Sequence, residues 1–250
     1  MSYSAVELLT VMTARSLKDG SRVFAGVGVP LVASVLAKRR HAPRLEIVVE
    51  GGVIDPIVMP GYLPISTNEM RIGRGATMLL DITDVFLLAQ RGLLDRGIIG
   101  AAQVDRFGNV NTSVIGPAER PRVRLPGTGG ANDIASLCGA VTVVTTHEQR
   151  RFVEKVDFVT SPGWLSGGSA RAEAGLVFGG VTDIITDLGR IAFDPIDRHP
   201  VLAAVHAGSS PERIRAMTAF DLAAADSVER PEPPTADELA LLRELTGAPT

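Results

Sequence analysis

One strand-like segment, residues 45–49, ends in an acid followed by two glycines, Glu50-Gly51-Gly52. An apolar, β-branched run bounded by glycines is typical of a buried strand in a parallel sheet. In open α/β sheets the ligand crevice lies beyond the carboxyl ends of the strands, so Glu50 is a candidate nucleophile or base. The alternative is a turn residue or a helix cap. We expect the two glycines to let a substrate or a second backbone approach closely.

A succession of strand, glycine turn and helix surrounds this segment. Residues 22–25 predict a strand that leads through a turn around Gly28 into an apolar helix over residues 31–37. Further strand-like runs follow at residues 98–104 and 141–145. This alternation predicts an α/β fold with an open, largely parallel sheet and flanking helices.

The C-terminal part of the chain contains a hairpin signal and a separate tail. Residues 181–193 predict a late hairpin, and residues 210–222 predict a short helix. A proline-rich linker then precedes a short amphipathic helix over residues 235–245. We therefore predict one domain over residues 1–228, with a linker and C-terminal helix over residues 229–250.

Charge and cysteine content exclude several classes of function. The net charge is −3 with acids and bases interspersed, so we expect no nucleic acid and no membrane as a partner. No apolar stretch approaches about 18 residues and the start lacks a basic signal segment, so we expect a cytoplasmic protein. Cys138 is the sole cysteine, which excludes an intrachain disulfide and a cysteine-based metal site. Its apolar neighbours predict a buried, inert thiol.

A second glycine cluster, with glycines at positions 127, 129 and 130, runs into a helix-like segment. Successive backbone N–H groups in such a turn can converge on an anion, either a phosphate or the oxyanion of a reacting carbonyl. The alternative is a tight turn with Asn132 or Asp133 as the helix N-cap.

Other reactive groups support weaker hypotheses. His147 is a candidate general base or, alternatively, a satisfied or exposed loop histidine. The remaining histidines have no companions at metal-ligand spacing, so no metal site is predicted; they are His41, His199 and His206. The turn around Gly28 lacks the third glycine of a dinucleotide fingerprint, which disfavours a nicotinamide-dependent oxidoreductase. We expect Trp164 to pack against a lid or a neighbouring protein chain.

Taken in order, these segments resemble the β subunits of class I CoA-transferases, and most of all the glutaconate branch. The resemblance extends over about residues 5–225, and its motifs lie at residues 26–30, 47–52, 100–111, 127–133, 147–151 and 159–164. It implies the class I CoA-transferase fold, a CoA thioester as substrate and no bound cofactor. It also implies a related α subunit, in a heterodimer or heterotetramer, with the active site at their interface.

The resemblance implies roles for individual residues. Glu50 matches the catalytic glutamate, which attacks the acyl-CoA thioester and becomes a glutamyl-CoA thioester. The glycine turn matches the segment whose backbone N–H groups bind the thioester oxyanion, which are here expected at Gly129, Gly130 and Ala131. Contacts with substrate or CoA are expected at Gly28, Gly51, Gln103, Asn109 and Asn132.

One departure bears on the chemistry. Glutaconate-type transferases carry serine after the glutamate, whereas this chain has Gly51. The sequence also resembles the β subunit of the cholesterol ring-cleaving hydrolase of actinobacteria, which opens the last steroid ring of a cyclohexenone carboxyl-CoA. In that branch the principal base belongs to the α subunit, so Glu50 would orient water or substrate. We predict such a hydrolase first, a dicarboxylate CoA-transferase second and a non-catalytic partner chain third.

Overall fold

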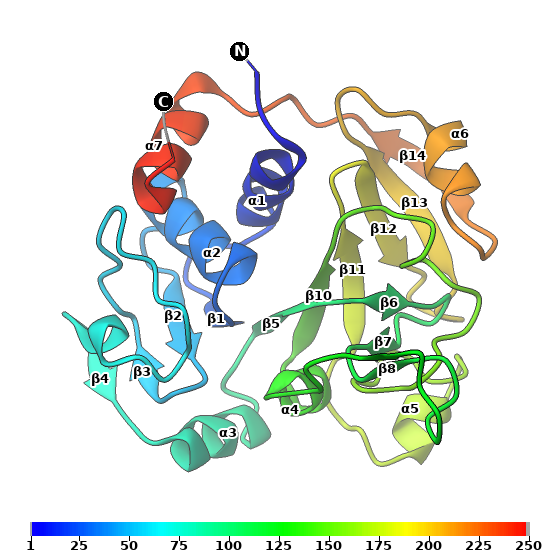
Figure 1. Ribbon diagram of the computed structural model, residues 1–250, viewed down its shortest axis with the longest axis horizontal. Helices are drawn as coiled ribbons and strands as arrows, with labels where there is room; N and C mark the ends of the chain where they lie inside the picture. The colour runs from blue at the N-terminus through cyan, green and yellow to red at the C-terminus, as the bar shows by residue number, and fades with distance from the viewer. Residues whose placement is uncertain (1, 249–250) are drawn as a thin grey trace. The chain divides into compact units, whose positions relative to one another are not determined.

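Residues 2–248 are described by a computed structural model, shown in Figure 1. The chain forms two units: the first comprises Met1–Ile98 and Pro233–Thr250, and the second is Ile99–Glu232. The expected domain boundary at residue 228 stays a prediction. The helix beyond it belongs to the first unit.

The strands of the first unit lie in the order β5-β1-β2-β3-β4. The central strand β1 pairs in parallel with both neighbours, whereas β2, β3 and β4 pair antiparallel in succession. The strands predicted at residues 22–25 and 45–49 are confirmed, and their side chains after the first residue are buried because both faces of the sheet are covered. The bounds are β1 Arg22–Ala25, β2 Glu46–Val49, β3 Val53–Ile54, β4 Met78–Leu79 and β5 Arg96–Gly100.

Three helices of the first unit pack against one another, and one of them is the C-terminal helix. The helix α2 contacts both α1 and α7, which also touch each other (Figure 1). Both α1 and α7 begin with a capping box, from Ser4 and Glu7 and from Thr235 and Glu238, which satisfies their first N–H groups. The bounds are α1 Ala5–Arg15, α2 Val29–Arg40, α3 Ile82–Gln90, the 3₁₀ helix η1 Met70–Gly73 and α7 Ala236–Thr246.

Two ion pairs connect the first helix to the last. The guanidinium of Arg15 donates to both carboxylate oxygens of Glu238, at 2.8 and 2.6 Å. In the opposite direction along the chain, Arg243 Nε donates to Glu7 at 2.7 Å. These bidentate and partly buried contacts hold α7 against α1.

The strands of the second unit lie in the order β14-β13-β12-β11-β10. The outer pairs β10–β11 and β13–β14 are parallel, and the hairpin predicted over residues 181–193 is confirmed as the antiparallel pair β11–β12. Two further strand pairs, β6–β7 and β8–β9, stand apart. The bounds are β6 Gln103–Val104, β7 Val110–Asn111, β8 Val114–Ile115, β9 Val123–Arg124, α4 Ala131–Leu137, β10 Ala140–Val144, α5 Ala170–Glu173, β11 Val181–Ile185, β12 Gly189–Phe193, β13 Pro200–Val205, α6 Pro211–Ala216 and β14 Ala223–Glu229.

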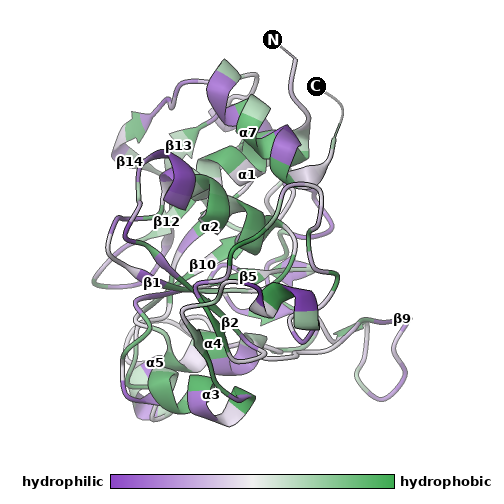
Figure 2. Ribbon diagram, turned by 90° about the vertical axis from the view of Figure 1, so that its left-hand side faces the viewer, coloured by the Kyte–Doolittle hydropathy of each residue, from purple (hydrophilic) through white to green (hydrophobic). Residues whose placement is uncertain are grey.

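Parallel strand pairs and surrounding helices confirm the α/β class. Figure 2 colours the body of α2 as apolar and its basic last turn as hydrophilic, in agreement with its buried residues. Across residues 2–248, none of the helices combines the length and the apolar character needed to span a bilayer.

Candidate active site

Glu50 lies on the tight turn that joins β2 to β3. Val49 pairs with Val53, so Glu50, Gly51 and Gly52 form a three-residue hairpin loop. The N–H of Gly52 donates to the carbonyl of Val49 at 3.0 Å and closes the turn. Glu50 is half-buried at the carboxyl end of β2. The turn therefore presents a carboxylate at the sheet edge where α/β proteins bind ligands.

Both glycines of this turn face another stretch of backbone. A Cβ atom on Gly51 would overlap the carbonyl oxygen of Thr67 and lie 2.6 Å from Asn68 Oδ1. Gly52 has a φ of +94°, and a Cβ there would overlap the carbonyl oxygen of Leu80. Because such overlaps cannot be accommodated without moving backbone, the expectation that a second backbone approaches these glycines is confirmed.

The turn after β1 lies at the same edge of the first unit. Phe24 pairs with Val48, so the register, continued by two residues, places Gly26 beside Glu50. Gly28 follows as the N-cap of α2, with a φ of +82°. It also borders a pocket of about 760 Å³ formed with residues of α1 and α7. The prediction that Gly28 contacts a ligand stays open, and its position at the carboxyl edge favours it.

The second glycine cluster turns directly into α4. Gly127 and Gly129 have φ values of +93° and +47°, and Gly130 is the N-cap of the helix. The alternative in which Asn132 or Asp133 caps α4 is wrong, because both residues lie inside its first turn.

Hydrogen bonds distinguish the expected oxyanion donors from one another. The N–H of Ala131 donates to the carbonyl of Thr128 at 2.9 Å, and the N–H of Asn132 donates to the Thr128 hydroxyl at 2.9 Å. For the N–H groups of Gly129 and Gly130, the described part of the chain offers no main-chain acceptor. These two groups are therefore better placed than Ala131 to bind an anion.

Two threonines absent from the sequence prediction hold the glycine turn. Thr112 and Gly127 exchange two hydrogen bonds, from the N–H of Gly127 to the Thr112 carbonyl and from the Thr112 hydroxyl to the Gly127 carbonyl, both at 2.8 Å. Asn132 Nδ2 donates to the carbonyl of Thr160 at 2.9 Å, and the Thr160 hydroxyl accepts from the N–H of Thr112. The run of hydrogen-bonding side chains over residues 111–113 was the available signal for this role.

Gln103 and Asn109 are buried and hydrogen-bonded within the second unit. Gln103 donates to Asp157 at 3.2 Å and accepts from Asn111 Nδ2 at 2.7 Å. Asn109 donates to the carbonyl of Leu165 at 2.8 Å and accepts from its N–H at 3.1 Å. These internal contacts favour a role in positioning loops, and direct contact of either residue with substrate or CoA stays a prediction.

His147 is a satisfied core histidine. Its two ring nitrogens lie 3.2 Å from the hydroxyl of Thr186 and 3.0 Å from that of Thr218, and the ring stacks on Phe152 with centroids 3.9 Å apart. Burial lowers the pKa of His147 to about 4, so the ring is neutral at pH 7. Cys138 is also buried, which confirms the inert thiol.

Trp164 packs inside the second unit. Its indole N–H donates to the carbonyl of Val181 at 2.7 Å, and the guanidinium of Arg198 lies 4.0 Å from the ring centroid. The expectation that Trp164 packs against a lid or a neighbouring chain is therefore wrong, because its partners belong to the same unit.

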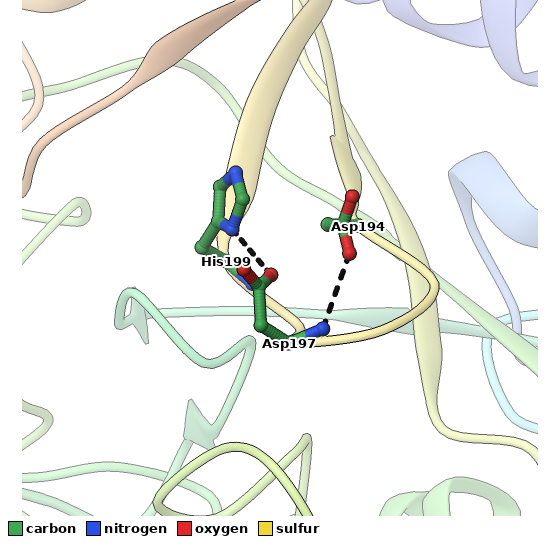
Figure 3. A group of neighbouring side chains, drawn as sticks. All are labelled: Asp194, Asp197 and His199. Atoms are coloured by element: carbon green, nitrogen blue, oxygen red, sulfur yellow. Dashed lines mark hydrogen bonds and ion pairs between the residues drawn. The ribbon is translucent and has the colours of Figure 1, made fainter.

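Three possible metal ligands, Asp194, Asp197 and His199, lie together on the turn between β12 and β13 (Figure 3). Histidine spacing alone did not predict this group, because two of its members are aspartates. His199 Nδ1 bonds to the carboxylate of Asp197, and Asp194 accepts from the N–H groups of Ile196 and Asp197. These bonds account for the arrangement as a turn, so no metal is assigned to it.

Comparison with known proteins identifies the family. The coenzyme A transferase family model matches residues 6–216, which is most of the chain. The chain belongs to the coenzyme A transferase family.

Individual relatives of this transferase-family chain differ in how much of it they match. It is 37% identical to the β subunit of 3-oxoadipate CoA-transferase of Pseudomonas knackmussii, over 98% of this chain and 94% of that protein. The crystal structure of glutaconate coenzyme A-transferase from Acidaminococcus fermentans matches with a TM-score of 0.90 and 34% identity, over 97% and 94% of the two chains, and confirms the expected fold. The IpdB chain of the cholesterol ring-cleaving hydrolase of Mycobacterium tuberculosis is 32% identical over 58% of each chain.

Proposed function

We propose that this chain is the β subunit of a heteromeric CoA-transferase that moves CoA between short dicarboxylic acids. The observation that carries the proposal is the position of Glu50, on a tight turn at the carboxyl end of β2. The similarity to 3-oxoadipate and glutaconate transferases extends over at least 97% of the chain, against 58% for the ring-cleaving hydrolase. This difference in coverage favours the transferase over the hydrolase that the sequence placed first.

The chemistry needs a carboxylate and no bound cofactor. Glu50 attacks the thioester carbonyl and expels the CoA thiolate, giving a mixed anhydride. The thiolate then attacks the glutamyl carbonyl, which releases the free acid and leaves CoA on Glu50 as a thioester. A second carboxylic acid reverses both steps and departs as the new acyl-CoA. The expected oxyanion donors Gly129, Gly130 and Ala131 belong to the same proposal.

The proposed partner is an α subunit of the same family. The relatives that match along their whole length are named as one of two unlike chains or come from a transferase of that kind. We therefore propose that this chain is inactive alone and works in a heterodimer or heterotetramer.

Covalent trapping tests the proposal. The chain is co-expressed with an α-type chain from the same genome and assayed for CoA exchange between glutarate-like acids, with borohydride added during turnover. We expect ping-pong kinetics and reduction of Glu50 to the alcohol only when acyl-CoA is present. Glu50→Gln should lower turnover at least about 100-fold, whereas Glu46→Gln, an exposed glutamate on the same strand, serves as the matched control. Full turnover by Glu50→Gln would contradict a nucleophilic role.

The second candidate is ring-opening hydrolysis of a steroid-derived CoA thioester, supported by the partial match to the ring-cleaving hydrolase. That reaction adds water to a ring ketone and cleaves a carbon–carbon bond, with CoA only as a handle. It would place oxygen-18 from solvent water in the new carboxylate and leave Glu50 unmodified by borohydride. The transferase predicts the opposite outcome in both measurements.

A further inference from the structure

Residues 57–82 of the first unit carry an unusual concentration of exposed apolar side chains. Ile65 is 84% exposed and Met70 is 95% exposed, which leaves both almost without packing partners. Soluble proteins rarely expose such groups together unless another surface covers them. We call the set the loop face; it comprises Ile57, Met59, Tyr62, Ile65, Met70, Met78, Leu79 and Ile82.

Contacts within the segment draw parts of the loop face together. The N–H of Ile57 donates to the carbonyl of Arg74 at 3.0 Å, and the Leu79 side chain lies beside Gly73. A pocket of about 270 Å³ is bordered by Ile57, Met59 and Tyr62 together with Arg71 and Arg74. The segment therefore presents a hollowed apolar surface with basic groups at its rim.

The exposed area suits a protein partner. A large side chain exposes about 200 Å² when nothing covers it, so the loop face amounts to on the order of 1,000 Å². A standard protein–protein interface buries roughly 800 Å² on each partner. The loop face is thus large enough to account for a stable interface without any further surface.

The same segment packs on the turn that carries Glu50. Thr67 and Asn68 lie between the exposed positions of the loop face and sit directly on Gly51. Leu80, next to Leu79, sits on Gly52 in the same way, and its N–H donates to the Gly52 carbonyl at 2.8 Å. Whatever covers the loop face therefore presses on both glycines of the Glu50 turn.

We infer that the loop face is the docking surface for the α-type partner, and that docking there fixes the turn that presents Glu50. The inference rests on the function proposed above and adds the surface and its coupling to the nucleophile. Full-length relatives that are named as one of two unlike chains favour an α-type partner over a second copy of this one. The partner surface should be apolar, with an acidic group opposite exposed Arg74.

Charge insertion into the loop face tests this inference. Ile65→Lys and Met70→Lys alter side chains that are almost fully exposed, so folding should persist, as thermal unfolding of the isolated chain will show. Val177→Lys and Ile196→Lys are matched controls, because these side chains are 83% and 85% exposed but belong to the second unit. Affinity for the α-type chain is measured by analytical ultracentrifugation.

We expect each loop-face variant to bind the partner at least about 10-fold more weakly and the controls to bind as wild type. Wild-type affinity in the loop-face variants, or equal losses in the controls, would overturn the inference. So would a homodimer of the isolated chain that the same variants dissociate, because the occupant would then be a second copy. Glu50→Gln should assemble normally, which separates failure of the docking surface from failure of the proposed chemistry.

Discussion

A Cβ atom on Gly51 would overlap the main-chain carbonyl oxygen of Thr67. The residue after the candidate nucleophile is thus glycine for a steric reason that lies in a different segment of the chain. The serine found at this place in glutaconate-type transferases would require residues 66–68 to follow another path.

Substituting Gly51 should therefore destabilise the protein. We expect Gly51→Ala to lower the free energy of unfolding by about 1–3 kcal/mol, the usual effect of overpacking. Gly26→Ala is the control, because a Cβ at Gly26 has no heavy atom within 4 Å. Urea denaturation of both variants checks this, and equal stability of the two would contradict the steric explanation.

The contact between Arg15 and Glu238 should depend on acidity. Burial raises the pKa of Glu238, but hydrogen bonds from Arg15 and Thr235 outweigh it and hold the pKa at about 2. The ordinary value is 4.5, so the stabilisation is complete above that pH and is lost as the pH falls toward 2. We expect hydrogen exchange in α7 to accelerate through this window.

The same ion pair can be removed at neutral pH. Glu238→Gln should cost roughly 1–3 kcal/mol, because Arg15 loses a charged acceptor. Glu244→Gln is the matched control on α7, since Glu244 is 57% exposed and lies 3.8 Å from Arg39. Such an exposed pair contributes at most about 1 kcal/mol. Similar losses in the two variants would show that the Arg15 contact has no special weight.

Two buried histidines should make the second unit sensitive to mild acid. Burial lowers the pKa of both His147 and His206 to about 4, from an ordinary 6.5. The unfolded chain therefore binds more protons below pH 6.5, so stability should fall as the pH drops from 6.5 to 4, by up to about 3 kcal/mol per histidine. Unfolding free energies at pH 7.5 and 5.0 measure this. His147→Gln should reduce the difference between the two pH values, and an unchanged difference would contradict it.

Arg171 should be intolerant of lysine. Its buried guanidinium donates to the carbonyls of Ala135, Gly163 and Phe178, at 2.7, 2.9 and 3.0 Å. An ammonium group cannot reproduce this planar fork, so Arg171→Lys should lose about 2 kcal/mol or more of unfolding free energy. Arg120→Lys, at an exposed position, should change it by less than about 0.5 kcal/mol. Equal denaturation midpoints would contradict the role of the fork.

Local signals predicted the regular elements of the fold well. The strand at residues 22–25 and the hairpin at residues 181–193 were recognisable because their apolar runs and turn residues are adjacent in the sequence. The strands β3 and β4 were not recognised, since each has two residues and depends on pairing with a distant segment.

The same distinction separates the parts of the candidate site. Glu50 could be placed at a strand end because the strand and its glycines are contiguous. The partners of Gln103 and Asn109 are more than fifty residues away in the chain, so their internal hydrogen bonds left no local pattern. The start of α4 was misjudged because Gly130 caps it without a side chain, whereas capping preferences favoured Asn132 or Asp133.

The pairing of α1 with α7 has a consequence for synthesis on the ribosome. Every residue of the second unit emerges before α7 does, whereas the first unit needs residues from both ends of the chain. We therefore expect the second unit to fold during translation while α1 and α2 keep an unfilled apolar face. Only the release of the last residues supplies the helix that covers it.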